Sequence, residues 1–259
     1  MTTDLVIVSE SDRIATVTLN RPEKRNAMHG PLIAELQKVL GILAADSSRI
    51  LIINGNGENF CAGGDIAWMQ QIAAGSEDQN YDDAQSLADL LYQLYTFPKP
   101  TLVLAHGATL GGGLGLLAAA DIAIASKNAS FGLPEVKIGI TPSMISPYMI
   151  SAIGERAAHY YFLTGERFNA DVALRIGLIH QVTENEALLS TGMTVAQLIL
   201  QNSPQALHSA KQLIRRVSKR AITEDLAQKT AEHLAELRAT PEAQEGLRAF
   251  LEKRTPNWT

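Results

Sequence analysis

The hydrophobic pattern of the chain changes from mixed to helical along its length. Five short apolar runs have the length and composition of strands, at 5–8, 14–19, 49–54, 101–105 and 120–125. Apolar residues at helical spacing predict helices at 31–45, at 83–96 and from about 112. Between these segments, the polar residues 73–82 are interpreted as a mobile loop. Strand-like and helix-like segments that alternate in this way indicate an α/β fold.

From Ser143 onward the pattern predicts almost nothing but helix, and 184–253 is typical of three or four amphipathic helices. We place a boundary near residue 195, which divides an α/β core at 1–195 from a helical region at 196–259. Because so short a helical region cannot bury all its apolar faces within itself, we expect it to pack on another part of the molecule or on another subunit.

Two glycine-bearing turns are the most distinctive local feature. Phe60–Asp65 and His106–Gly115 each follow a predicted strand, and each is expected to open a helix. The first N–H groups of a helix have no partner within it, and glycine lets a ligand approach them closely. Side by side, the two turns could direct two N–H groups at one carbonyl oxygen, as in an oxyanion hole. Glu135 would then be the proton-transfer group beside it.

Composition and charge exclude several classes of function. The chain has 259 residues, 46% of them hydrophobic, and a net charge of −5, so nothing predicts general attraction to nucleic acid or to an anionic membrane. Cys61 is the only cysteine, which excludes an intrachain disulfide. There is no signal-peptide pattern at the start and no apolar run long enough to cross a membrane. We therefore expect a soluble cytoplasmic protein that binds no membrane, with nucleic acid an improbable partner.

Short motifs along the whole chain carry a family resemblance. They are Asn20-Arg21-Pro22, Asn26-Ala27, Phe60–Ile66, Gly111-Gly112-Gly113, Ala120-Asp121-Ile122, Phe131–Glu135 and Leu163–Glu166. In this order and spacing, they make the chain resemble the enoyl-CoA hydratase/isomerase (crotonase) family from about residue 4 to the C-terminus. The resemblance implies a crotonase-like spiral of ββα units, a helical C-terminal trimerisation region, and a homo-oligomer that is a trimer or a dimer of trimers. It also implies an acyl-CoA thioester substrate, with coenzyme A as part of the substrate and no separate cofactor.

The resemblance also assigns roles to individual residues. The N–H groups of Gly64 and Gly112 match the oxyanion-hole donors, and Glu135 matches the second of two catalytic glutamates. The remaining matches are residues that bind CoA or line its path: Lys24, Arg25, Ala27, Ala62, Asp65, Ile66, Phe250 and Lys253. The last two lie where the family completes the CoA site, often from a neighbouring subunit.

The chain departs from the family at two places. Gly115 stands where the typical hydratase has its first catalytic glutamate, and Thr141–Tyr148 replaces a segment that usually ends in Thr-Gln-Arg. These features resemble a bacterial subgroup that hydrates 3-methylglutaconyl-CoA or isohexenylglutaconyl-CoA. Ser143 or Ser146 could help Glu135 to hold the water, and Tyr148, Ser146 and His159 are candidates to meet a distal carboxylate on the substrate.

We therefore predict an enoyl-CoA hydratase that acts on a branched, 3-methylglutaconyl-type thioester. Two alternatives stay open. An enoyl-CoA Δ3,Δ2-isomerase needs only one base at Glu135 and no bound water. A non-catalytic relative could bind CoA thioesters or RNA with a relic site.

Structural roles compete with the functional ones at several residues. The glycine turns could serve only close packing, and Glu135 could be a surface acid near Lys137. For Asp65 we favour a helix cap over proton transfer. For Cys61 we favour a buried thiol over a nucleophile activated by His106. The six histidines lack metal-ligand spacing, so we predict no metal. The basic cluster Lys211, Arg215, Arg216, Lys219 and Arg220 is interpreted as a solvated helix face.

Overall fold

The protein is built on a six-stranded sheet. The computed structural model describes residues 5–258. In spatial order the strands are β1 (Val6–Ser11), β2 (Ile14–Leu19), β3 (Ile50–Gly55), β4 (Thr101–Ala105), β6 (Ile122–Ser126) and β9 (Gln181–Thr183). The first two form an antiparallel hairpin, and every later pair is parallel. The sheet is therefore mixed, with its parallel part made by crossover connections.

A small second sheet lies beside the first. It contains β5 (Ala108–Leu110), β7 (Ser130–Gly132) and β8 (Phe168–Asn169), and Cys61 adds a parallel bridge to Thr109. The chain thus passes repeatedly from a strand of the large sheet to a short strand of the small one and then into a helix. This path is the spiral of ββα units that the family resemblance implies.

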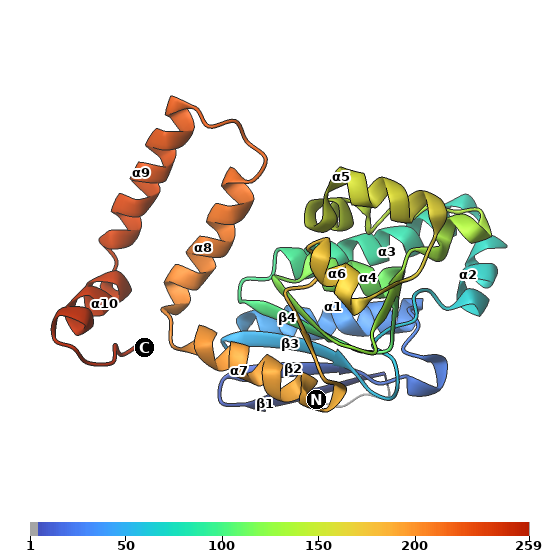
Figure 1. The fold of residues 1–259 in the computed structure, drawn as a ribbon, viewed down its shortest axis with the longest axis horizontal. Coiled ribbons are helices and arrows are strands. Elements are labelled where there is room, and N and C mark those ends of the chain that lie inside the picture. Colours follow the sequence, from blue (N-terminus) through green and yellow to red (C-terminus); the bar gives the residue numbers. More distant parts are fainter. Residues whose placement is uncertain (1–4, 259) are drawn as a thin grey trace.

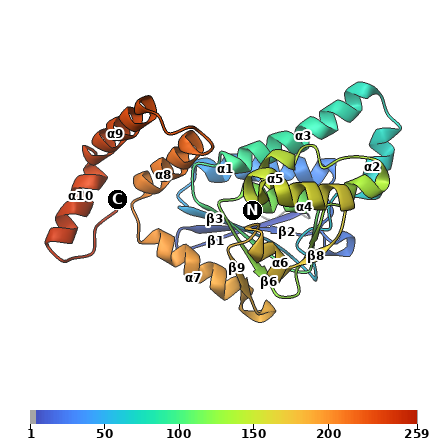
Figure 2. The ribbon, with the colours of Figure 1, turned by 45° about the horizontal axis from the view of Figure 1, so that its top comes forward.

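The helices surround the large sheet or extend from it (Figures 1 and 2). In chain order they are α1 (Gly30–Ala45), α2 (Ile66–Ala73), α3 (Glu77–Tyr95), α4 (Gly112–Ala119), α5 (Ser146–Thr164), α6 (Ala170–Arg175), α7 (Leu188–Leu200), α8 (Pro204–Val217), α9 (Glu224–Arg238) and α10 (Pro241–Leu251). The described chain also has three short 3₁₀ helices, at Pro22–Lys24, Pro134–Ile138 and Asn185–Ala187. No helix among residues 5–258 is long and apolar enough to cross a membrane.

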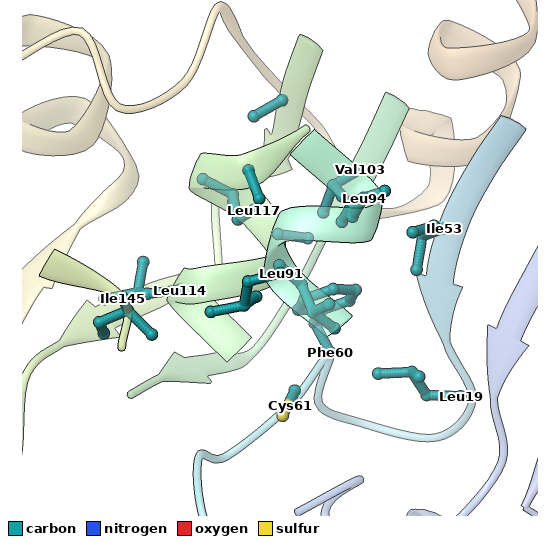
Figure 3. Close-up of a cluster of buried hydrophobic side chains, with 14 of the residues drawn as sticks. Leu19, Ile53, Phe60, Cys61, Leu91, Leu94, Val103, Leu114, Leu117 and Ile145 are labelled. Carbon is teal, nitrogen blue, oxygen red and sulfur yellow. The ribbon is translucent and has the colours of Figure 1, made fainter. Parts of the chain in front are cut away.

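The sheet is buried on both faces because its central strands contain uninterrupted apolar runs, such as Ile50–Ile53 in β3. In β3, Leu51 and Ile53 belong to the large cluster formed with α1, α3 and α4, whereas Ile50 and Ile52 belong to a smaller cluster under α7. Successive side chains of a strand point to opposite faces, so an uninterrupted apolar run suits a strand covered on both sides. Figure 3 shows part of the large cluster, in which Phe60 and Cys61 lie among leucines of α3 and α4.

The strands and helices predicted for the first half are present, but the prediction of a mobile loop at 73–82 is wrong. Helix α2 extends to Ala73, and α3 begins at Glu77. Ser76 and Gln79 form a capping box, in which each side chain accepts a hydrogen bond from the backbone N–H of the other. This local start signal stabilises a helix whose first turns are polar because they face solvent.

The second half is less helical than predicted. Strands β8 and β9 each contain three residues or fewer, too short to give a period, and β9 completes the edge of the large sheet. Four helices follow, as expected. The boundary placed near residue 195 falls inside α7, and Val195 and Ala196 pack against the sheet. Packing on the core therefore continues to the end of α7, and the division into two domains stays a prediction.

The region beyond α7 stands away from the core (Figures 1 and 2). Leu234, Leu247, Phe250 and Leu251 are all at least half exposed on α9 and α10, so the region does not bury its own apolar faces. Helix α8 is attached to the core through Lys211, whose ammonium group donates to Asp121 Oδ2 over 2.6 Å. Lys211 is therefore buried, and its assignment to a solvated helix face is wrong.

Other members of the basic cluster differ from Lys211. Arg215 packs over the ring of Tyr95, 4.6 Å from its centroid. Arg216, Lys219 and Arg220 are exposed, as predicted. The sequence shows the basic cluster, but it does not show that Lys211 pairs with Asp121, the residue directly before β6.

We predict that Lys211→Met weakens the attachment of α8. Asp121 also accepts hydrogen bonds from the N–H and hydroxyl of Thr101, and it would be left without its cation. Breaking a buried ion pair costs about 3–5 kcal/mol; we expect about 3 kcal/mol of the free energy of unfolding, because the Asp121 side chain is 29% exposed. Urea unfolding followed by circular dichroism measures this loss. Arg216→Met, on the exposed face of α8, is the control and should change the value little.

Candidate active site

The two glycine turns and Glu135 line one cavity of about 190 Å³. It lies where the N-terminal ends of α2 and α4 meet the 3₁₀ helix at Pro134–Ile138. The lining residues are Met28, His29, Ile33, Ala62, Gly63, Gly64, Ile66, Trp68, Met69, Asp83, Leu87, Gly111, Gly112, Pro134, Glu135, Ile138, Ile140, Thr141, Pro142, Met144 and Ile145. The sequence-predicted pair of turns is therefore brought together with its acid.

The first turn leaves the N–H of Gly64 unpaired. Met28 donates to Gly63 O over 2.7 Å and accepts from Asp65 N over 2.8 Å, so the residues on either side of Gly64 make the backbone bonds. In a parallel bridge of this kind, the intervening residue directs its own N–H away from the partner strand. Among the described residues, none accepts a hydrogen bond from Gly64 N.

The second turn likewise leaves the N–H of Gly112 unpaired. Gly111 adopts φ +46°, a left-handed backbone that glycine tolerates, and donates to Gly132 O over 3.1 Å. Gly112 is the first residue of α4, so its N–H has no partner within the helix. No backbone acceptor is paired with it elsewhere in the described chain. The cavity thus contains two unpaired backbone donors and the positive end of a helix dipole.

Glu135 lies directly against the second turn. A Cβ atom added to Gly111 would be 3.0 Å from Glu135 Oε1. The other carboxyl oxygen, Oε2, is buried and has no hydrogen-bond partner among the described residues. Burial raises the pKa of the Glu135 carboxyl above its ordinary value, because burial penalises the charged form. Lys137 is exposed and makes no ion pair with Glu135 in the described chain, so the surface-acid interpretation is wrong.

Comparison with known proteins agrees with this geometry. The sequence model of the enoyl-CoA hydratase/isomerase family matches residues 9–259. The chain belongs to this family. It is 34% identical over 257 residues to the 2,3-dehydroadipyl-CoA hydratase of Escherichia coli, covering 98% of each chain. It is 34% identical over 252 residues to the short-chain-enoyl-CoA hydratase of Clostridium acetobutylicum, covering 96% of this chain and 95% of that one.

The fold agrees as well. The structure of an enoyl-CoA hydratase from Shewanella pealeana superposes with a TM-score of 0.95 at 40% identity, covering 98% of this chain and 96% of that one. This member of the enoyl-CoA hydratase/isomerase family therefore has the crotonase fold, an α/β structure, as the resemblance implied.

The position of the family's usual first glutamate has no space for a side chain. A Cβ atom on Gly115 would be 2.6 Å from Ile145 Cγ2 and 3.1 Å from Leu91 Cδ1. Gly115 is buried in α4 and does not line the cavity. The missing carboxylate is thus replaced by apolar packing, and Glu135 is the acid that lies against Gly111 of the second glycine turn.

The serine and tyrosine candidates lie outside the cavity. Ser143 shares a hydrogen bond of 2.6 Å with Thr141, and the Ser146 hydroxyl donates to the Ser143 carbonyl. Only Thr141 of these three residues lines the cavity. Tyr148 lines a different hollow, between α8 and the core, and His159 is exposed.

Asp65 has the structural role that the sequence favours. Its Oδ1 accepts from Ala67 N over 3.1 Å and caps α2, while its Oδ2 pairs with Arg21 at 2.8 Å. The hydrogen bond from Arg21 lowers the pKa of the Asp65 carboxyl below its ordinary value. A carboxylate so occupied orients the turn and does not face the cavity.

The other CoA candidates are placed unequally. Ala62 and Ile66 line the cavity. Lys24 and Arg25 are exposed at the neighbouring 3₁₀ helix, and Ala27 is buried beside them. Phe250 and Lys253 lie on or after α10, far from α2 in both views (Figures 1 and 2), so this chain does not bring them to its own cavity. Their contacts with CoA stay predictions.

Three polar residues of the cavity were missed from the sequence. Trp68 Nε1 donates to Asp83 Oδ1 over 2.7 Å, and the His29 ring meets the Trp68 ring edge-on at 6.0 Å between centroids. His29 Nδ1 is buried without a hydrogen-bond partner among the described residues. Only the fold joins these residues, since they come from the starts of α1 and α2 and the first turns of α3, and no short motif links them.

Cys61 is a buried thiol, as favoured. Burial raises its pKa to about 12, which leaves little thiolate near neutral pH. His106 is not its base, because the His106 ring pairs with Gly57 O at 3.0 Å. Within residues 5–258, no group of three or more histidine, cysteine or acidic side chains could hold a metal ion.

We predict that a side chain cannot be introduced at position 115 by simple substitution. Gly115→Ala places a methyl group 2.6 Å from Ile145, and overpacking of this kind costs about 1–3 kcal/mol of the free energy of unfolding. Gly41→Ala, in the exposed middle of α1 with no atom closer than 3.8 Å, should instead gain up to about 1 kcal/mol. Urea unfolding of both variants measures the contrast. A stabilised Gly115→Ala would contradict the packing described.

We also predict that Glu135 lowers the free energy of unfolding as the pH rises. Its folded-state pKa is raised, so the folded protein binds the proton more tightly than the unfolded chain, and stability falls as the pH rises from its ordinary pKa of 4.5 through the folded value. Glu135→Gln should therefore unfold at higher urea than the wild type at about pH 8, with a difference that shrinks towards pH 5. Glu155→Gln, an exposed change on α5, is the control. A pH-independent difference would contradict burial as the cause.

Proposed function

We propose that the protein is an enoyl-CoA hydratase that adds water across the α,β double bond of an enoyl-CoA thioester. The observation that carries the proposal is the convergence of two unpaired N–H groups, at Gly64 and Gly112, with the buried carboxyl of Glu135 in one cavity. The relatives named above are hydratases of CoA thioesters, which supports the same reaction class.

The geometry suits chemistry beside a thioester carbonyl. Negative charge collects on the carbonyl oxygen when a nucleophile adds at Cβ, and the two fixed N–H donors stabilise that charge. Glu135 accepts a proton from water as the water oxygen bonds to Cβ. The same carboxylic acid then delivers a proton to Cα, so the elements of water are added and Glu135 is regenerated. One acid serves both steps because Gly115 supplies none.

An isomerase is the second candidate, and the packing around Gly115 favours it. A Δ3,Δ2-isomerase moves a proton between two carbons of the acyl chain, for which one carboxylate and an oxyanion hole suffice. Position 115, which is a glycine, supplies no second acid to hold a water beside Glu135. The two reactions differ in mass, since hydration adds one water and isomerisation adds nothing.

We further propose a homo-oligomer, a trimer or a dimer of trimers. The exposed apolar residues of α9 and α10 need a covering surface. In such an assembly Phe250 and Lys253 would complete the CoA site of a neighbouring subunit, and Lys24, Arg25 and Ala27 would contact the nucleotide of their own. No metal or separate cofactor is part of the proposal.

The acyl group is left open by the relatives, whose names specify 2,3-dehydroadipyl-CoA in one case and short-chain enoyl-CoA in the other. We keep a branched acyl chain, as in 3-methylglutaconyl-CoA, as our prediction, because the apolar cavity walls at Met28, Leu87 and Ile145 can accept the branch. The distal carboxylate of 3-methylglutaconyl-CoA would need a cation or a hydroxyl beside it, so the prediction covers the branch and not the carboxylate.

The activity is tested with crotonyl-CoA and 3-hexenoyl-CoA, followed by the absorbance of the conjugated enoyl thioester and by product mass. We expect crotonyl-CoA to lose absorbance and gain one water. A rise in absorbance from 3-hexenoyl-CoA at unchanged mass would make the protein an isomerase. Binding without any turnover would leave a non-catalytic CoA-thioester protein.

We predict that Glu135→Gln lowers kcat by about 10²–10⁴-fold, the usual range for loss of general acid–base catalysis. Glu155→Gln should leave kcat unchanged. Because the pKa of Glu135 is raised, the rate should fall on the acid side at a pH above the ordinary glutamate range. Near-wild-type turnover of Glu135→Gln would exclude Glu135 as the proton-transfer group.

A further inference from the structure

We propose that the cavity selects uncharged acyl chains and rejects chains that end in a carboxylate, with Asp83 as the specificity-determining residue. This inference rests on the proposed function, because it names the class of acyl group that the same site accepts. Three features of the cavity support it: the absence of a cation from its lining, a fixed carboxyl group on one wall, and an imidazole held uncharged.

The first feature is the charge of the lining. Among the described residues that line the cavity there is no lysine and no arginine, whereas Asp83 and Glu135 both line it. Arg21 is close enough for its charge to act on His29, but its guanidinium is already occupied: it pairs with Asp65 at 2.8 Å and donates to Ala27 O over 3.1 Å. An incoming carboxylate would therefore lose its water without gaining a cation.

The second feature is Asp83 itself. Its Oδ1 accepts a hydrogen bond of 2.7 Å from Trp68 Nε1, which fixes the carboxyl group against a residue that also lines the cavity. Among the described residues, no cation lies within ion-pair distance of Asp83. An acid held in this way presents negative charge to the cavity, and a second carboxylate beside it is repelled.

The third feature is His29, which could otherwise supply a positive charge. Burial, and then the charge of Arg21, lower the pKa of His29 below its ordinary value of 6.5. The ring is therefore mainly neutral near pH 7 and offers a hydrogen bond rather than a charge. Its Nδ1 atom has no hydrogen-bond partner among the described residues. A hydroxyl on an uncharged acyl chain could form a hydrogen bond with this atom.

The test uses two substrates that differ only in the carboxylate, 3-methylcrotonyl-CoA and 3-methylglutaconyl-CoA. We expect the wild type to show a kcat/KM at least about tenfold higher for 3-methylcrotonyl-CoA, because like charges brought together are strongly disfavoured. Asp83→Asn removes the charge and keeps an oxygen for Trp68 Nε1. It should raise the ratio of kcat/KM for 3-methylglutaconyl-CoA to kcat/KM for 3-methylcrotonyl-CoA by about tenfold.

The matched control is Asp82→Asn, an exposed acid on the same helix, which changes the net charge equally but does not line the cavity. It should leave the ratio of the two kcat/KM values unchanged. If Asp82→Asn shifted the ratio as much as Asp83→Asn, the effect would come from the overall field, and Asp83 would not be the specificity residue.

Binding of the saturated thioesters separates this inference from the proposed function. Isovaleryl-CoA and 3-methylglutaryl-CoA cannot be hydrated, and their dissociation constants are measured by calorimetry on the wild type and both variants. Weaker binding of 3-methylglutaryl-CoA that Asp83→Asn relieves would support the inference even if no thioester were turned over. Equal or tighter binding of 3-methylglutaryl-CoA by the wild type would overturn it, whatever the catalytic result.

Discussion

The site depends on direct contact between the backbones of the two glycine turns. Leu110 N donates to Cys61 O over 2.9 Å, and Cys61 N donates to Ala108 O over 3.1 Å, so the turns are joined as a short sheet. A Cβ atom on Gly113 would lie 2.6 Å from Cys61 O. Helix α4 can therefore start beside the first turn only because no side chain separates them. That contact sets the N–H groups of Gly64 and Gly112 into the same cavity, with Glu135 against them.

Burial of Glu135 beside these donors lowers the stability of the fold. Its buried Oε2 has no partner among the described residues, and its pKa is raised by the same burial. Unpaired polar groups of this kind are rare in protein interiors and are typical of groups that act on a ligand. The N–H groups of Gly64 and Gly112 are likewise without a partner among the described residues. Folding leaves these hydrogen-bonding groups unused, and a thioester carbonyl and a water molecule can use them.

The sequence predicted the parts of the site that are local. The glycine turns follow buried strands, and Glu135 follows Pro134, so short motifs sufficed to find them. His29, Trp68 and Asp83 were missed because three different helices bring them together. Asp83 was placed at the start of a helix whose true beginning, at Glu77, was mistaken for a loop.

Long-range packing limited the fold prediction in the same way. Strands β8 and β9 are too short to show a period, and their places are fixed by neighbours in the sheets. Lys211 looked like one member of an exposed cluster, since its partner Asp121 lies on a distant segment. The absence of a side chain at Gly115 was visible in the sequence, whereas its physical reason, contact with Leu91 and Ile145, required the structure.

The Gly64 and Gly112 N–H groups are expected to polarise the carbonyl of a bound thioester. Isotope-edited infrared spectroscopy of crotonyl-CoA carrying ¹³C at the thioester carbonyl, bound to Glu135→Gln to prevent turnover, measures this polarisation directly. We expect a carbonyl stretch at clearly lower frequency than that of the free thioester in water, because two fixed donors withdraw electron density from the C=O bond. A bound frequency equal to or higher than the free one would contradict it.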